Sequence, residues 1–347
     1  MLDISEKRFL AILPQINFLL SLLIVFHHGF ISIVRYNGSF SPFSYGLTVS
    51  IERYLYNISE CAVPFFFFLS AYLFYRTYDG SWSQYLYKIK RRFWSLLIPY
   101  IIFGTIGYVK VRLFSPSEME GGGGISYLSS LWLSNTMPLW FIRELIAFTI
   151  FAPLIWHIKN SIWMSVLISS ILICLTSLNI VSQRSFLYWM PLYLLGAMLN
   201  KNMIICIAKR FDHSSFQFLA IIFLCIYCVA AWFLPNGFEK VNIINCLLFT
   251  LFRLSTPFVM CVVIWFIIKN NIPDIRFMHY SFFVYCMHAP VITLTGIVYD
   301  RTLYMLFNYE IVKYFTVVIL AYIVCVLSAQ FIERFFPRCW SIMNGKR

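Results

Sequence analysis

The sequence has few charged residues and no long polar segment. Only 12% of its 347 residues are Asp, Glu, Lys or Arg, and only 14 of these are acidic, whereas soluble domains carry roughly 25% charged residues. No stretch is polar enough to form a separate soluble domain. We therefore expect a single integral membrane domain over residues 1–347, without an appended soluble domain.

Metal-ligand spacings of the usual kind are also missing, and we expect no metal site. The ten cysteines lie mostly inside apolar segments. Cys225 and Cys228 form a C-x-x-C, but it has no second pair, which favours packing as small apolar side chains. The first residues place Lys7 and Arg8 before an apolar run that is too long for a signal peptide and has no small-residue cleavage site, so we expect a retained first helix.

The sequence is rich in apolar runs, with 61% hydrophobic residues. A helical membrane span needs about 20 mostly apolar residues, and runs such as PFFFFLSAYLF lack the alternation of β-barrel strands. These runs predict an all-α, polytopic membrane helix bundle with about ten transmembrane helices. They cover residues 10–33, 57–75, 93–113, 138–157, 161–179, 185–200, 215–235, 243–269, 279–298 and 310–332.

The distribution of basic residues predicts the orientation. Lys and Arg gather on the cytoplasmic side of membrane proteins, and 17 of the 27 basic residues fall there if both termini are cytoplasmic. The net charge of +13 is then explained by topology and by attraction to anionic membrane lipids, so no nucleic-acid partner is needed. The segment SPSEMEGGGGISYLSS, residues 115–130, is predicted to be a flexible external loop.

Several polar residues lie inside the predicted spans, where they are costly and often functional. His27 and His28 are adjacent in the first span, and histidine is the side chain best suited to moving protons near neutral pH. The others are Glu60, Arg143, Glu144, Arg253 and His288. Hydrogen bonds and ion pairs between helices explain each residue singly, whereas one shared polar cavity in the outer half of the bundle explains the set. Neighbours on a helix point about 100° apart, so Arg143 and Glu144 are expected to have different partners.

A basic segment precedes the third predicted span. Lys88, Lys90, Arg91 and Arg92 are followed by Phe93 and Trp94. Two interpretations stay open: a positive-inside anchor with an aromatic belt, or a phosphate-binding patch.

Six motifs in order resemble the acyltransferase-3 family of bacterial integral membrane acyltransferases. The resemblance runs from the first span to the C-terminus, and its motifs are INFLLSLLIVFHH, CAVPFFFFLSAYLFYR, KIKRRFWSLLIPYI, MPLWFIRELIAFTIFAPLI, FLYWMPLYLLGAML and HYSFFVYCMHAPVI. The resemblance implies transfer of an acyl group, commonly acetyl, from cytoplasmic acyl-CoA to a glycan hydroxyl at the bacterial cytoplasmic membrane. It places the family's first-helix histidine on His28.

The sequence departs from the family pattern at three positions. Asn17 stands where the family has an arginine eleven residues before the histidine. Ser95 replaces a further basic residue that is common in the basic loop, and Ala71 replaces a glycine. The first two changes bear on the contacts to acyl-CoA.

The resemblance assigns roles to the polar residues. His28 is the expected base for the acceptor hydroxyl, or a nucleophile that forms an acyl-histidine. Arg143 or Arg253 is the expected oxyanion donor, with Glu144 in the same polar set and His288 as a second contact or a structural hydrogen bond. We expect Lys90, Arg91 and Arg92 to contact the acyl-CoA donor, together with Asn17, which stands at the position of the family's arginine. The acceptor is a surface polysaccharide, a lipid-linked saccharide or a small glycoside.

Three rival interpretations remain. A transporter or flippase for a glycan intermediate predicts inverted repeats and broken helices, and Pro257 and Pro290 are candidate break points. A lipid-modifying acyltransferase of the other large membrane family also uses an intramembrane histidine but lacks this ordered motif set. A catalytically inactive homologue would be consistent with Asn17 and Ser95. The sequence leaves the oligomeric state open, a homo-oligomer included.

Overall fold

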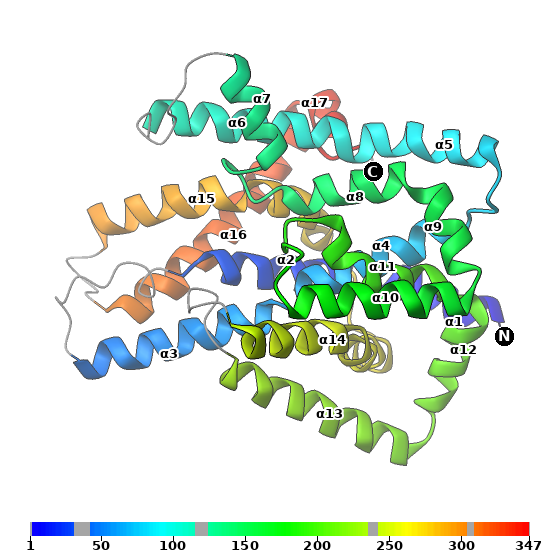
Figure 1. Ribbon diagram of the computed structural model, residues 1–347. Helices are drawn as coiled ribbons and strands as arrows, with labels where there is room; N and C mark the ends of the chain where they lie inside the picture. The colour runs from blue at the N-terminus through cyan, green and yellow to red at the C-terminus, as the bar shows by residue number, and fades with distance from the viewer. Residues whose placement is uncertain (1, 31–41, 115–123, 235–241, 304–308, 347) are drawn as a thin grey trace. The chain divides into compact units, whose positions relative to one another are not determined.

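Helices account for nearly all of the described chain in the computed structural model (Figure 1). The structure describes residues 2–30, 42–114, 124–234, 242–303 and 309–346, and these residues contain no β-strand. The all-α prediction is therefore confirmed. Residues 115–123 of the predicted glycine-rich loop lie outside the described residues, but residues 124–130 are helical, because ISYLSSLWL is apolar enough to continue as a helix.

The described residues form a series of helices. In chain order they are α1 (Leu2–Ala11), α2 (Leu13–His28), α3 (Pro42–Ser59), α4 (Ala62–Tyr75), α5 (Trp82–Arg92), the π-helix η1 (Phe93–Leu97), α6 (Ile98–Phe114), α7 (Gly124–Leu133), α8 (Trp140–Ile150), α9 (Ala152–Lys159), α10 (Ile162–Ser177), α11 (Phe186–Met198), α12 (Lys201–Arg210), α13 (Ser214–Phe233), α14 (Ile243–Lys269), the 3₁₀ turn η3 (Arg276–Tyr280), α15 (Ser281–Thr302), α16 (Glu310–Phe335) and α17 (Pro337–Met343).

The protein is a multi-pass membrane protein by the length and composition of its helices. In the described residues, six helical stretches are long and apolar enough to cross a membrane, and up to eight if each of two bent pairs is one span. The two pairs are α8 with α9 and α11 with α12, while α2 and α10 are apolar but have only 16 residues each. The described part of every predicted apolar segment is thus mainly helical, and the count of ten spans stays a prediction.

The bent pairs have identifiable causes. Between α11 and α12 the chain turns by 85°. Asn200 adopts an extended conformation there, and its side chain accepts a hydrogen bond from the Met203 N–H at 3.0 Å, so it caps the start of a new helix. Between α8 and α9, Pro153 lies in the first turn of α9, where its missing N–H costs nothing.

Two other prolines do not break their helices. Pro257 lies inside α14 and Pro290 inside α15, and both helices continue through them. Hydroxyl side chains bond to the backbone next to the first: Ser255 Oγ donates to the Phe252 carbonyl at 2.8 Å. Such local bonds help a membrane helix to tolerate proline. The break points that the transporter interpretation offered at these prolines are therefore not formed.

The helices group into two compact units that are interleaved along the chain. Unit 1 comprises Met1–Leu23, Arg53–Tyr85 and Ile150–His279, and unit 2 comprises Ile24–Glu52, Leu86–Thr149 and Tyr280–Arg347. Four of the five crossings between the units fall inside the helices α2, α3, α5 and α8.

The centre of unit 1 is the packing of α4 against α11. Phe67 stacks on Trp189 with ring centroids 5.1 Å apart. The helices approach so closely at Gly196 that a Cβ there would lie 2.1 Å from the Phe68 carbonyl oxygen. Because that atom belongs to the backbone of α4, only glycine fits without moving a helix.

We expect Gly196→Ala to destabilise the protein by about 2 kcal/mol or more, because the added methyl group forces α4 and α11 apart. A thermal unfolding transition in detergent measures the effect. Gly296→Ala is the matched control, since a Cβ at Gly296 meets nothing within 4 Å. Equal melting temperatures for the two variants would contradict the close approach at Gly196.

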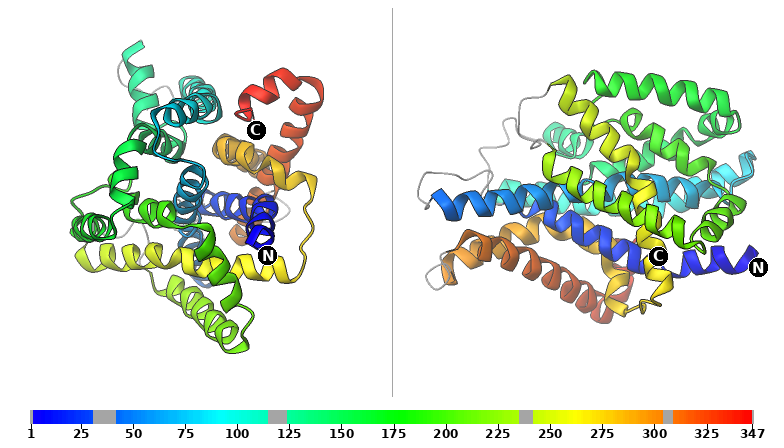
Figure 2. Two further views of the ribbon diagram at one scale, coloured as in Figure 1. Left: turned by 90° about the vertical axis from the view of Figure 1, so that its right-hand side faces the viewer. Right: turned by 90° about the horizontal axis from the view of Figure 1, so that it is seen from below.

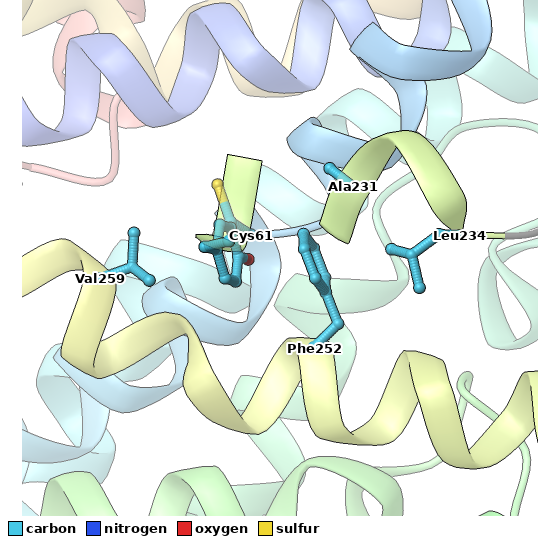
Figure 3. Packing of buried hydrophobic residues seen from close by; sticks show 6 residues of the cluster. Cys61, Ala231, Leu234, Phe252 and Val259 are labelled. Atoms are coloured by element: carbon cyan, nitrogen blue, oxygen red, sulfur yellow. The ribbon is translucent and has the colours of Figure 1, made fainter. Parts of the chain in front are cut away.

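A second apolar cluster joins α4, α13 and α14 in unit 1. Figure 3 shows Cys61, Ala231, Leu234, Phe252 and Val259 gathered there, and all are buried, as is Tyr227 of the same cluster. Tyr227 stacks on Phe252 at 4.0 Å.

Polar side chains of α3 donate hydrogen bonds to the backbone carbonyls at the end of α13. Asn57 donates to the carbonyls of Ala231 and Leu234, both at 3.0 Å, and Arg53 donates to the Leu234 carbonyl at 2.9 Å. The last carbonyls of a helix have no partner within it, so these bonds remove an otherwise costly set of buried acceptors.

The opposite face of α13 is exposed and apolar, as at Phe218 and Phe233. A helix with such a face fits contact with lipid. Cys225 is exposed on this helix and Cys228 is only half-buried, so the prediction that this pair serves buried packing is wrong for Cys225. All ten cysteines are free thiols.

Buried Glu6 ties α1 to α4 and α12. Its carboxylate accepts from the Tyr72 hydroxyl at 2.8 Å and pairs with Arg76 at 3.1 Å and Lys201 at 3.2 Å. Burial raises the pKa of the Glu6 carboxyl, but the hydrogen bonds from Tyr72 and Lys201 and the two positive charges outweigh it, so the pKa is lowered.

Unit 2 is built on α15 and α16, which pack along each other (Figures 1 and 2). α6 packs on α15, and α17 packs on both α6 and α16. The rings of Phe103, Phe283 and Trp340 form the contact between these helices, with centroids 5.8 and 5.6 Å apart. α7 folds back on α6, where Tyr127 bonds to Thr105 at 2.8 Å.

The predicted placement of both termini in the cytoplasm gives a labelling experiment. Variants that retain only Cys206 in α12 or only Cys339 in α17, both exposed, should react with a membrane-impermeant maleimide in inside-out vesicles and not in right-side-out vesicles. A cysteine introduced at the exposed Ser182, in a predicted outer loop, should show the reverse. The same sidedness for Ser182→Cys and Cys339 would refute the topology.

Candidate functional site

The end of α2 is fixed onto α16 within unit 2. The helix ends at His28, and a Cβ at the next residue, Gly29, would clash with the Val318 side chain and lie 3.4 Å from the Tyr314 ring. The Tyr314 hydroxyl donates to the Phe26 carbonyl at 3.1 Å, and the same carbonyl accepts from the Gly29 N–H at 3.2 Å at the helix end. These contacts position His27 and His28.

The structure brings His28 and His288 together. The two imidazole centroids are 4.9 Å apart and the ring planes are inclined by 37°. The His27 ring lies 5.0 Å from that of His28, edge to face. His28 is partly exposed, whereas His288 is 0% exposed. Two predicted site residues that are 260 positions apart in the sequence therefore form one imidazole pair.

The hydrogen bond of His288 defines its tautomer. Its Nδ1 lies 2.7 Å from the Tyr285 carbonyl oxygen. A carbonyl only accepts, so Nδ1 carries the proton, and in the neutral ring Nε2 is the acceptor. This buried Nε2 has no hydrogen-bond partner among the described residues. A buried acceptor without a donor is costly, and a donor that reaches Nε2 would therefore bind favourably.

α8 is joined to the histidine pair through Tyr285. The Tyr285 hydroxyl donates to the Pro138 carbonyl at 2.9 Å, and its ring meets Phe141 edge to face at 5.8 Å. The Tyr285 and His288 rings are 6.1 Å apart on α15. The segment that carries Arg143 and Glu144 thus begins beside the helix that carries His288.

Arg143 and Glu144 form an ion pair with each other. The Nε and Nη2 atoms of Arg143 donate to Glu144 Oε1 at 2.8 and 2.5 Å, and Nη1 donates to the Trp132 carbonyl at 2.5 Å. The expectation that neighbours 100° apart have different partners is wrong here, because the long arginine side chain turns back to its neighbour. Arg143 also satisfies a carbonyl at the end of α7. Its side chain keeps 20% exposure.

Arg253 belongs to unit 1, and its bonding groups are occupied. Its Nε and Nη2 atoms bind Glu60 Oε2 at 3.0 and 2.7 Å, and Nη1 donates to the Tyr188 hydroxyl. With its side-chain oxygen turned inward, Gln183 accepts from Nη1 and Nη2 at 2.7 Å.

The Arg253 guanidinium also packs against aromatic rings. The rings of Tyr188, Trp189 and Phe249 lie within 5.1–5.7 Å of it. The side chain is 2% exposed, and all five N–H groups are used, so this arrangement is a closed structural network.

We expect Glu60→Gln to destabilise the protein by about 3 kcal/mol, because it leaves the buried guanidinium without a counter-charge. Adding Arg253→Met should recover part of this loss. Chemical unfolding in detergent measures the stability, and kcat is measured on the folded fraction. If Arg253 binds the reacting oxygen, the double variant will be stable but will lose most of its kcat; if it is structural, kcat will survive.

The basic segment lies at the junction of α5 and α6 in unit 2. Lys90 and Arg91 are exposed and Arg92 is half-buried. The Arg91 guanidinium lies 5.8 Å from the centroid of Tyr87. The π-helix Phe93–Leu97 follows directly, and π-helical turns frequently occur at functional sites. Lys90 and Arg91 thus present positive charge at the surface of the described residues.

Asn17 and His28 lie on the same helix, α2. Eleven residues of α-helix advance about 16 Å and return to nearly the same face. Asn17 is half-buried. The departure from the expected arginine therefore changes the charge on the face of α2 that ends in His28.

Sequence reasoning missed one buried carboxylate in unit 2. Glu52 on α3 is 0% exposed and lies near enough to Tyr314 to interact electrostatically. The second apolar stretch runs from Gly46 rather than from residue 57. A hydropathy window drawn from Gly46 would have included Glu52 as an intramembrane acid.

The fold and this site define a class: a multi-pass helical membrane protein with a histidine pair between its helices. The profile of the acyltransferase-3 family, described as an acyltransferase domain, matches residues 16–330. The chain belongs to this family and is a membrane acyltransferase. No curated protein and no solved structure matches it. The matched range contains all the predicted site residues, from Asn17 to His288.

Proposed function

We propose that this protein transfers an acetyl or other short acyl group from cytoplasmic acyl-CoA to a hydroxyl of a cell-surface or lipid-linked glycan, at the bacterial cytoplasmic membrane. The observation that carries the proposal is the imidazole pair of His28 and His288. A partly exposed imidazole next to a buried one of fixed tautomer is a suitable arrangement for proton transfer.

The proposed reaction exchanges a thioester for an ester. His28 accepts the proton of the acceptor hydroxyl while the oxygen attacks the thioester carbonyl. The C–S bond then breaks, and the proton passes from the imidazolium to the CoA thiolate. In the covalent variant, a nitrogen of His28 attacks the thioester carbonyl and expels CoA as the thiolate; the hydroxyl oxygen then attacks the acyl-imidazole, the N–acyl bond breaks, and the hydroxyl proton passes to the thiolate. Both routes give the same products.

His288 supports His28 as a hydrogen-bond acceptor in this proposal. Its Nδ1–H is held by the Tyr285 carbonyl, so its buried Nε2 accepts from the N–H of His28 or from the acceptor hydroxyl. That bond fixes which nitrogen of His28 is free to take a proton. If both imidazoles took up an added proton, two positive charges would lie side by side. The pair therefore favours one imidazolium at a time.

Of the two arginines, Arg143 is the better oxyanion donor. It lies on the helix whose first turns contact Tyr285, and it keeps accessible surface. Arg253 would have to leave Glu60, Tyr188 and Gln183 first. Glu144 then keeps the Arg143 guanidinium oriented.

The donor side of the proposal rests on Lys90, Arg91 and Arg92. The charge of all three, and the exposure of Lys90 and Arg91, fit the phosphates of CoA. By the predicted topology they face the cytoplasm, where acyl-CoA is made, whereas His28 lies toward the outer face. The acyl-pantetheine arm or the acyl group itself would then pass into the protein.

His28→Ala should lower acyl transfer by about a hundredfold or more, the usual contribution of a general base. Radiolabelled acetyl-CoA is supplied to the cytoplasmic side of sealed inside-out vesicles, and label in the glycan fraction is counted. His27→Ala is the matched control, because it removes the neighbouring imidazole and should change the rate less than about threefold, the range of an indirect effect.

Glycan labelling that is equal for wild type and His28→Ala would refute the role of His28. If label never enters the glycan but glycan movement across the membrane depends on the protein, the transporter interpretation holds. Mass spectrometry of surface glycans from cells with and without the protein identifies both the acyl group and its acceptor.

A further inference from the structure

A lysine beyond the range of the family match lies beside the basic segment. The Lys346 ammonium is 3.5 Å from the centroid of the Trp94 ring, well within the range of a cation–π contact. Trp94 follows Arg92 by two residues, about 3 Å along a helix axis. Because the family profile ends at residue 330, membership assigns no role to Lys346.

The backbone holds Lys346 in an unusual conformation. After α17 (Pro337–Met343), Gly345 at φ 69° and Lys346 at φ 54° are both left-handed. The Lys346 N–H donates to the Ser341 carbonyl at 2.6 Å, which closes the turn. This conformation is disfavoured for a residue with a Cβ. A strained residue at a surface turn is a reason to look for a function of its side chain.

The turn is fitted closely onto the π-helix. A Cβ at Gly345 would lie 2.7 Å from the Ser95 carbonyl oxygen and 2.8 Å from the Ser95 Cα. Next to it, Asn344 is 8% exposed, and its Oδ1 has no hydrogen-bond partner among the described residues. The contact with Ser95 therefore fixes the position of Lys346 over Trp94.

The Lys346 ammonium contacts the Trp94 ring on one side and is open to solvent on the other. The lysine is exposed and Trp94 is 37% exposed. A cation held against an aromatic face can still donate from its remaining N–H groups to a phosphate. Trp94, on which Lys346 lies, follows the exposed Lys90 and Arg91 by four and three residues, so this lysine adds a positive charge to the basic segment. Phosphate esters are the ligands that such groups bind.

We propose that Lys346 and Trp94 belong to the donor site, and that Lys346 binds a phosphate group of acyl-CoA. This rests on the proposed function, because it takes acyl-CoA as the donor. The positive charge that Ser95 lacks is then supplied by a residue 251 positions later in the chain, which the turn after α17 lays against Ser95.

The experiment compares steady-state kinetics with acetyl-CoA for wild type and Lys346→Gln. We expect KM for acetyl-CoA to rise about fivefold, the range of a partly exposed ionic contact, with kcat nearly unchanged. The difference should shrink as salt is added. Lys346→Arg keeps the charge and should retain most of the affinity. Lys269→Gln is the matched control, since Lys269 also lies over a tryptophan, Trp265, at 4.6 Å, and it should not change KM.

Unchanged KM in Lys346→Gln overturns the role of Lys346, as does an equal rise in Lys269→Gln. The measurement is made in nanodiscs of zwitterionic lipid and of mixed zwitterionic and anionic lipid. A defect present in both supports a phosphate of CoA, whereas a defect found only with anionic lipid means that Lys346 binds a lipid headgroup, which refutes the proposal. If the wild-type protein does not turn over acetyl-CoA, acetyl-CoA is refuted as the donor. This result is distinct from one that refutes only the role of Lys346.

Discussion

A charged side chain among apolar helices must be paired, and this requirement organises the polar residues of this protein. Arg253 is enclosed by Glu60, Tyr188 and Gln183, and Arg143 turns back onto Glu144. Glu6 collects Tyr72, Arg76 and Lys201 around one carboxylate. With only 14 acidic residues in the chain, pairing takes up a notable share of them. A buried polar atom that has no hydrogen-bond partner among the described residues, such as Nε2 of His288, is therefore informative.

Much of the fold could be predicted from the sequence, because hydropathy depends on residue type alone. Each apolar segment is mainly helical where the structure describes it, and the family resemblance selected His28 and His288. The predictions were wrong where side-chain length or tertiary contacts determine the partner, the direction or the burial of a residue. A helical wheel separates Arg143 from Glu144, but it ignores the reach of a long flexible side chain. Hydropathy did not reveal that Asn200 would start a new helix at 85° to the last. It also placed Cys225 in the interior, although α13 turns that side outward.

The site shows the same division between what a motif states and what packing decides. The sequence indicated two histidines, but not that their rings lie 4.9 Å apart. That separation depends on Gly29 against Val318 and on the Tyr314 hydroxyl at the Phe26 carbonyl. The tautomer of His288 depends on one carbonyl, that of Tyr285. No spacing rule contains this information, because each contact joins segments that are distant in the chain. Lys346 is a further example, since its proximity to Trp94 follows from the turn after α17.

The interleaving of the two units bears on biosynthesis. Unit 1 draws its last segment from residues up to His279, and unit 2 draws its last from Tyr280 onward. A chain emerging from the ribosome therefore cannot complete either unit until most of the protein has been made. His28 leaves the ribosome early, whereas α15 and α16, which hold it in place, come last. The early helices must wait in the bilayer with their polar residues incompletely satisfied, and a premature stop at the start of α15 would leave the helices up to α14 without the His288 partner of His28.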